Sequence, residues 1–330
     1  MALAVAAAVA AAPYLYLRSL GLIGDPERGP RVSVVVPRGA STEAIGRRLE
    51  RRGVVPSALG FRIAAALEGA GEEIQAGRYR LHRNLSARAA LRALARGPEA
   101  AAFVSVTFPE GSWLTDFARI VARDTHLSGR RFLRLARSGR VRAELRPASV
   151  DSLEGLLFPS TYQVVRREGE RGLLERLVAQ LEEEVARLNL GRIEALGHSP
   201  YDAVIVASMV EAEAKVAADR ARIAAVIYNR LEAGMMLEID ATVSYALGEH
   251  KRSLSRADLE VDSPYNTRRY PGLPPTPIGA PGRASLEAAA DPARGDWLYY
   301  VLADCRGRHA FSTTYEEFLA DKSRYEALEC

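Results

Sequence analysis

The chain has 330 residues, of which 48% are hydrophobic and 26% are charged, and its formal net charge is +4. This length exceeds the usual size of a single domain and predicts two, and the composition is that of a globular protein. Nearly all basic residues are arginine and no basic run alternates with aromatic residues, so nucleic acid is not an expected partner.

The cysteines and histidines give no sign of a metal site. Cys305 and Cys330 lie in no CxxC pair, and the five histidines form no HxxH or HExxH pattern. We therefore expect neither a metal nor a cofactor. A disulfide between the two cysteines is compatible with an oxidising compartment.

The N-terminus is apolar. Residues 1–17 carry no charged side chain, and hydrophobic residues resume after Arg18. A spanning helix needs about 20 residues, so residues 1–23 predict a single membrane anchor if Arg18 lies at the membrane interface. A cleaved signal peptide and an alanine-rich soluble helix are the alternatives. Either an anchor or a signal peptide would place the globular part outside the cytoplasm. A Gly/Pro-rich linker at residues 24–30 follows this apolar segment.

Residues 31–98 predict a small module with the order strand, helix, helix, strand and a last helix. The predicted strands are 31–37 and 76–81, and the predicted helices lie around Ile45 and Leu49, at 61–67, and from 85 to a stop at Gly97-Pro98.

Residues 101–330 predict a larger α+β domain. A strand at 103–108 precedes a helix containing Phe117 and Ile120, and residues 153–162 form a dense cluster of aromatic and turn residues. A long amphipathic helix is expected at 171–188, with Glu182, Glu183 and Glu184 on its solvated face.

The C-terminal part of this domain alternates helices with loops and ends in paired strands. Helices are expected at 217–231 and 285–290, an irregular cleft-lining loop at 265–278, strands at 297–302 and 309–312, and a capped terminal helix from Thr314.

The most informative stretch is a helix that ends near Glu211. Ser199 is a suitable N-cap, Pro200 suits the first turn, and Asp202 lies three residues after the cap. The following run to Val210 is apolar and predicts a buried helix. A carboxyl group held against apolar surface keeps its proton to higher pH, which a general acid requires. The alternative is an ordinary solvated glutamate at a helix end.

Short motifs recur through the chain in a fixed order. The most specific are Ala207–Glu213, Tyr228–Leu231, Gly234–Leu237, Asp240–Val243, Leu254–Leu259, Tyr265–Thr267 and Gly272–Pro275. Together they resemble the endolytic murein transglycosylase family, the MltG/YceG-like proteins, over nearly the whole chain after residue 30. Residues 31–98 are similar to the family's LysM-like, peptidoglycan-binding module, and residues 101–330 to its catalytic domain.

The resemblance implies cleavage of the β-1,4 bond between N-acetylmuramic acid and N-acetylglucosamine inside nascent glycan strands, leaving 1,6-anhydro ends. Glu211 matches the family's catalytic glutamate. The implied substrate-binding residues are Glu213, Asn229, Asp240, Thr242, Tyr265, Asn266 and Thr267. The implied partners are peptidoglycan strands, peptidoglycan synthases and the inner membrane, with a single-pass anchor and the catalytic domain on the periplasmic side.

Two other functions stay open at this point. A hydrolysing muramidase would use a second carboxylate and water, whereas a transglycosylase can use one carboxylate because the attacking hydroxyl belongs to the same sugar. A non-catalytic glycan-binding scaffold would rely on residues 31–98. Purely structural roles are also open for single residues. Glu213 can form an ion pair, and Asn229 and Asn266 can cap a helix or a turn. Asp240 can support its loop, and Tyr265 can pack in the core.

Overall fold

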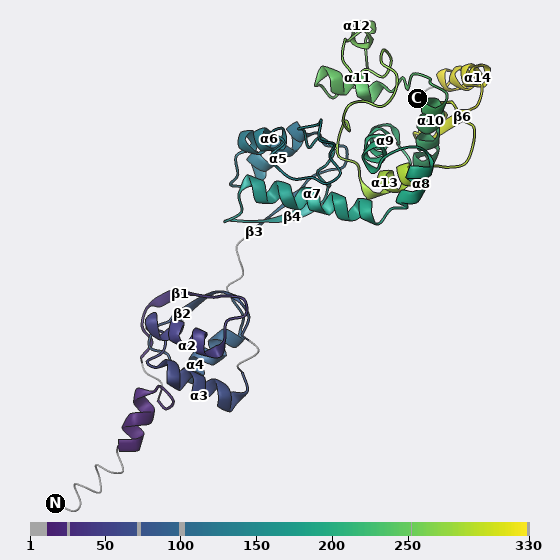
Figure 1. Cartoon of the computed structure of the whole chain (residues 1–330). Coiled ribbons are helices and arrows are strands. Elements are labelled where there is room, and N and C mark those ends of the chain that lie inside the picture. Colours follow the sequence, from purple (N-terminus) through teal and green to yellow (C-terminus); the bar gives the residue numbers. More distant parts are fainter. Residues whose placement is uncertain (1–11, 25–26, 71–73, 99–102, 252, 329–330) are drawn as a thin grey trace, which may run out of the picture. The chain divides into compact units, whose positions relative to one another are not determined.

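A computed structural model describes residues 12–24, 27–70, 74–98, 103–251 and 253–328. The chain divides into two compact units, Met1–Ala101 and Ala102–Cys330. Each unit is described by itself below, with the element labels of Figure 1.

The first unit pairs two strands and packs three helices against them. Its elements are β1 (Arg31–Val36), α2 (Thr42–Arg51), α3 (Ala58–Glu68), β2 (Gly77–His82) and α4 (Ala87–Ala95), and residues 12–19 are also helical. The order of strands and helices is the one that the sequence predicts.

Local signals account for these elements. Ser41, Ser57 and Ser86 are N-caps, and each side chain accepts a hydrogen bond from the backbone N–H three residues on. The strands are antiparallel, with Val34 opposite Tyr79, and both of these side chains are buried. Alternate residues therefore face the core of the unit, and the others face solvent.

The second unit is mostly helical, with two small antiparallel sheets. In chain order its elements are β3 (Phe103–Thr107), α5 (Leu114–Asp124), α6 (Gly129–Ala136), β4 (Thr161–Val165), α7 (Glu170–Ala186), α8 (Leu190–Ala195), α9 (Pro200–Glu213), the 3-10 turn η1 (Ala217–Asp219), α10 (Arg220–Glu232), α11 (Asp240–Leu247), α12 (Arg256–Leu259), α13 (Arg283–Ala290), β5 (Tyr299–Leu302), β6 (His309–Ser312) and α14 (Tyr315–Glu326).

Helix α9 lies in the middle of this unit. It contacts α8, α10, α11 and α13, and its side chains belong to one continuous apolar core. Strand β3 pairs with β4 and β5 pairs with β6. The expected α+β class is confirmed.

Two local predictions differ from the structure. Strand β4 was not expected, because its first two residues belong to the aromatic and turn cluster at 153–162. The strand forms by pairing with β3. Glu184 was expected on a solvated face, but its side chain is only 3% exposed. Arg187 and Arg283 both donate to its carboxylate, and these partners make its burial possible.

The expected membrane anchor at residues 1–23 lies partly outside the described residues, which begin at residue 12. Within the described ranges, no helix has both the length and the apolar character needed to cross a membrane. Cys330, which a disulfide to Cys305 would require, also lies outside them.

Candidate functional site

Glu211 lies in the last turn of α9. The predicted start of this helix is confirmed: Ser199 and Asp202 form a reciprocal capping box, and Pro200 is the first helical residue. All residues from Ala203 to Val210 are buried, so the helix is apolar on every side. Its final turn carries Glu211 out of this core, with 9% of the side-chain surface exposed.

Two groups from neighbouring elements approach the Glu211 carboxylate. The backbone N–H of Gly282 donates to Oε2 at 3.0 Å. Gly282 is the N-cap residue of α13, where the helix leaves N–H groups unpaired. Arg220, the first residue of α10, places Nη2 3.9 Å from Oε1. The Arg220 side chain is itself fixed, because Nε donates to the buried hydroxyl of Ser285 at 3.2 Å.

A second carboxyl group, that of Glu110, belongs to the same site. The turn before α5 is tied to the chain before α13 by two backbone hydrogen bonds, from Gly111 N to Ala280 O at 2.8 Å and from Ala280 N to Ser112 O at 2.9 Å. These bonds bring Glu110 against Gly282. A Cβ atom at Gly282 would lie 2.0 Å from Oε1 of Glu110, so glycine allows this approach.

The two carboxyl groups interact electrostatically. Partial burial raises the pKa of Glu110, and the charge of Glu211 raises it further, while Arg220 opposes both effects. A negative charge beside a carboxyl group disfavours its ionisation, so the charge of Glu211 favours the protonated form of Glu110.

Glu213 faces a different group of neighbours. It lines a pocket of about 270 Å³ together with Lys215, Asp240, Lys251 and His309. Burial raises the pKa of Glu213, the charge of Asp240 adds to this rise, and a hydrogen bond with Tyr300 opposes it. The last turn of α9 therefore presents carboxylates to two distinct surroundings.

The predicted loop residues are hydrogen-bonded inside the protein. Thr242 and Thr267 are 0% and 1% exposed, and their hydroxyl oxygens lie 2.9 Å apart. Asn266 is also 0% exposed, and its Nδ2 donates to Leu259 O and Val261 O. Thr267 therefore joins the irregular loop to the start of α11 through Thr242, and Asn266 joins it to the end of α12.

Asn229, Asp240 and Tyr265 lie nearer the surface and also have protein partners. Asn229 Nδ2 donates to the carbonyls of Gly295 and Trp297, each at 2.9 Å. Asp240, with 60% of its side chain exposed, pairs with Arg268 at 2.7 Å. The Tyr265 hydroxyl lies 2.9 Å from Oγ1 of Thr276. Of these three, Asp240 lines the same pocket as Glu213.

The described residues include no group of three or more His, Cys, Asp or Glu side chains placed to hold a metal ion. The arrangement around Glu211 suits proton transfer by its carboxyl group. Fixed hydrogen-bond donors and a second carboxyl group lie beside it.

Comparison with known proteins identifies the family of the chain. A model of the YceG-like family matches residues 34–324. An endolytic murein transglycosylase of Bacillus subtilis (strain 168) is 32% identical over 327 residues, which cover 94% of this chain and 89% of that protein. This chain belongs to the YceG-like family.

Further relatives support the same assignment. The endolytic murein transglycosylase of Streptococcus pneumoniae (strain ATCC BAA-255 / R6) is 27% identical over 92% of this chain, which spans 60% of that longer protein. A crystal structure of a YceG-like protein from Listeria monocytogenes matches 88% of this chain and 99% of that one, with a TM-score of 0.59 and 31% identity.

Sequence analysis of this YceG-like chain missed Glu110, Arg220 and Gly282. The available signal was the Pro-Glu-Gly turn directly after strand β3, because a polar residue in a tight loop beside a rigid element is a common place for function. Nothing in the local sequence connects that turn to Glu211.

The buried carboxyl group of Glu154 leads to a prediction about stability. Glu154 is 3% exposed and accepts hydrogen bonds from Leu114 N and the Tyr245 hydroxyl. Burial raises its pKa from 4.5 to about 7. Between these pH values the folded state holds a proton that the unfolded state has lost, so stability falls as pH rises, by about 1.4 kcal/mol per unit for a fully developed difference.

The variant Glu154→Gln cannot lose a proton at this position. Its unfolding free energy is therefore expected to fall less than that of the wild type between about pH 5 and about pH 7, and to exceed that of the wild type at higher pH. Urea unfolding across this range measures the slope. Glu194→Gln, at an exposed position, is the matched control and should keep the wild-type slope. Equal slopes in all three proteins would contradict the prediction.

Proposed function

We propose that this chain is a lytic transglycosylase that cuts the β-1,4 bond between N-acetylmuramic acid and N-acetylglucosamine inside nascent peptidoglycan strands. The relatives named endolytic murein transglycosylase support the substrate class. The observation that carries the reaction is the position of Glu211, which leaves a buried helix with 9% of its side chain exposed and one backbone N–H on its carboxylate.

In the proposed reaction Glu211 acts first as an acid. Its proton passes to the glycosidic oxygen, which leaves with the bonding electrons as a hydroxyl of N-acetylglucosamine, and C1 of N-acetylmuramic acid becomes oxocarbenium-like. The ionised Glu211 then takes the proton from the C6 hydroxyl of the same sugar, and that oxygen bonds to C1. The product has a 1,6-anhydro end, no water is consumed, and Glu211 recovers its proton. Because the attacking hydroxyl belongs to the substrate, much of its entropy cost is already met.

The other predicted residues divide by what they contact. Glu213 and Asp240 line a pocket beside the end of α9 and are proposed to bind substrate there. Thr242, Asn266 and Thr267, which are buried, are proposed to hold the loop that borders the site. Asn229 is proposed to fix the segment at 295–297, and Tyr265 the segment at Thr276.

The rest of the chain is proposed to bring this site to its substrate. Residues 31–98 have the strand and helix order expected for a LysM-like module and are proposed to bind peptidoglycan. Residues 1–23 are proposed to anchor the protein in the inner membrane, with the catalytic unit on the extracytoplasmic side, where peptidoglycan synthases would be partners.

One observation favours a second candidate function. Glu110 places a second carboxyl group beside Glu211, and hydrolytic glycosidases use two carboxylates, one of which can activate water. A muramidase on this fold would produce reducing ends.

Digestion of purified glycan strands in water enriched in oxygen-18, followed by mass spectrometry, separates the two reactions. A transglycosylase gives anhydro ends that contain no heavy oxygen, because its nucleophile comes from the sugar. A muramidase gives reducing ends that carry the label. Labelled reducing ends would overturn the proposal, and so would an absence of cleavage by folded protein that still binds the strands, which would favour the scaffold function.

A further inference from the structure

The positive charge of the chain is concentrated in one part. Residues 31–98 contain 13 arginines and five acidic residues, although the whole chain has a net charge of only +4. The first unit is therefore strongly basic and the remainder of the chain is acidic. A charge excess of this kind attracts anions and speeds their association.

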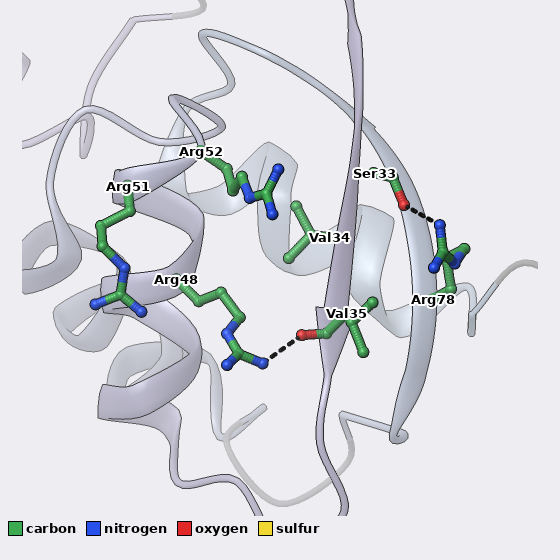
Figure 2. Close-up of a pocket in the computed structure, with 7 residues that line it drawn as sticks. All are labelled: Ser33, Val34, Val35, Arg48, Arg51, Arg52 and Arg78. Atoms are coloured by element: carbon green, nitrogen blue, oxygen red, sulfur yellow. Dashed lines mark hydrogen bonds between the residues drawn. The ribbon is translucent and has the colours of Figure 1, made fainter.

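Four of these arginines line one pocket of about 490 Å³ in the first unit (Figure 2). Arg48, Arg51 and Arg52 follow one another around the C-terminal turn of α2, at the three- and four-residue spacings that share a helix face. Arg78 comes from β2, where it pairs with Val35 of β1. The other described lining residues are Ser33, Val34 and Val35, so none of the carboxylates that the structure describes lines the pocket.

Two of the guanidinium groups are held by the pocket wall. Arg48 Nη1 donates to the carbonyl of Val35 at 2.9 Å, and Arg78 Nη1 donates to Oγ of Ser33 at 3.0 Å (Figure 2). Each guanidinium has five N–H donors, so each bond leaves donors available. Both bonds fix the side chains, which lowers the entropy cost of binding a ligand.

The other two arginines have no counter-charge within the described part of the chain. Among the residues that the structure describes, Arg51 and Arg52 form no hydrogen bond or ion pair through their side chains. Three acidic residues that the structure describes between residues 31 and 98 have partners elsewhere: Glu43 pairs with Arg47, Glu68 pairs with Arg88, and Glu50 accepts from Ala58 N.

The helix dipole explains only some of the four arginines in this cluster. Cations at a helix C-terminus gain about 0.3–1 kcal/mol from the helix dipole, which accounts for arginines at the end of α2. It does not account for Arg78, which belongs to a strand, or for four like charges around one cavity. Guanidinium groups match the oxygens of a phosphate through paired N–H donors, and clusters of them are the usual phosphate site.

We propose that this pocket binds a phosphate group bearing at least two negative charges, such as a diphosphate or phosphomonoester. The same chemistry is offered by a soluble or polymeric phosphate and by the headgroup of an anionic lipid. This inference concerns the first unit only and does not depend on the reaction proposed for Glu211.

Calorimetric titration of the full chain with inorganic pyrophosphate tests the pocket. The double variant Arg51→Gln/Arg52→Gln should weaken binding about tenfold or more, because charge-assisted hydrogen bonds are among the strong ones. The control Arg62→Gln/Arg92→Gln removes the same charge from exposed positions of the same unit that do not line the pocket, and should change affinity less than about twofold. Absent binding by the wild type, or equal losses in both variants, would overturn the proposal.

Co-sedimentation with vesicles identifies the source of the phosphate. The wild type and both double variants are compared on vesicles of phosphatidic acid in phosphatidylcholine and on phosphatidylcholine alone. Any membrane insertion by the N-terminal segment contributes equally to all three proteins. A loss confined to the pocket variant on phosphatidic acid supports a lipid headgroup as the ligand. Pyrophosphate binding with no such loss supports a soluble or polymeric phosphate.

Discussion

Replacing Glu211 with glutamine is expected to reduce the rate of glycan cleavage by about a thousandfold or more, since general acid–base catalysis contributes about 10²–10⁴ and this residue is proposed to serve in both directions. Glutamine has nearly the same shape, and its carbonyl oxygen can accept the hydrogen bond from Gly282 N that Glu211 accepts in the wild type. The variant should therefore fold and bind glycan strands. Release of anhydro-ended fragments, followed over time by chromatography, gives the rate.

Two further variants make this result specific. Glu213→Gln lies two residues away and faces the neighbouring pocket, so it should weaken substrate binding more than it lowers the maximal rate. Glu175→Gln, in an exposed ion pair with Arg171, should leave the rate within about twofold of wild type. If Glu211→Gln retained a tenth or more of the wild-type rate, Glu211 could not be the acid, and another carboxyl group would have to supply the proton.

The sequence predicted best the features that depend on neighbouring residues. The capped start of α9, the paired strands β5 and β6, and the capping box of Thr314 and Glu317 are all confirmed. Each of these is specified by residue types a few positions apart. Strand β4 was missed because its partner β3 lies more than fifty residues earlier, and β-pairing across such a separation leaves little local signal.

In the candidate site, too, the sequence predicts what depends on neighbouring residues and misses what depends on distant ones. Glu211 could be selected because the apolar run before it belongs to its own helix. Glu110 could not, because it reaches the site through the backbone bonds between Gly111 and Ala280, far apart in the sequence. The spacing of Thr242 and Thr267 likewise does not reveal that their hydroxyl groups meet each other inside the protein. Such pairings follow from tertiary packing alone.

Removing the charge of Glu110 is expected to move the pH dependence of cleavage. With Glu110→Gln, a neutral amide replaces the carboxyl group whose pKa is raised by burial and by the charge of Glu211. A negative neighbour favours retention of a proton on the other carboxyl group, so its loss makes the acid step fail at lower pH. The alkaline limb of the kcat/KM profile should shift to lower pH, and the rate above that limb should fall about three- to tenfold.

Two variants distinguish this role from simple structural support. Gly282→Ala keeps the Glu110 charge but introduces a Cβ atom 2.0 Å from Oε1, which must displace the flexible side chain of Glu110. It should shift the alkaline limb in the same direction by a smaller amount. Glu287→Gln removes the same charge from an exposed position of α13 and should leave the profile unchanged. If Glu110→Gln lowered thermal stability while the alkaline limb stayed in place, Glu110 would only support the turn before α5. A carboxylate that acts on Glu211 through its charge must move the pH limb.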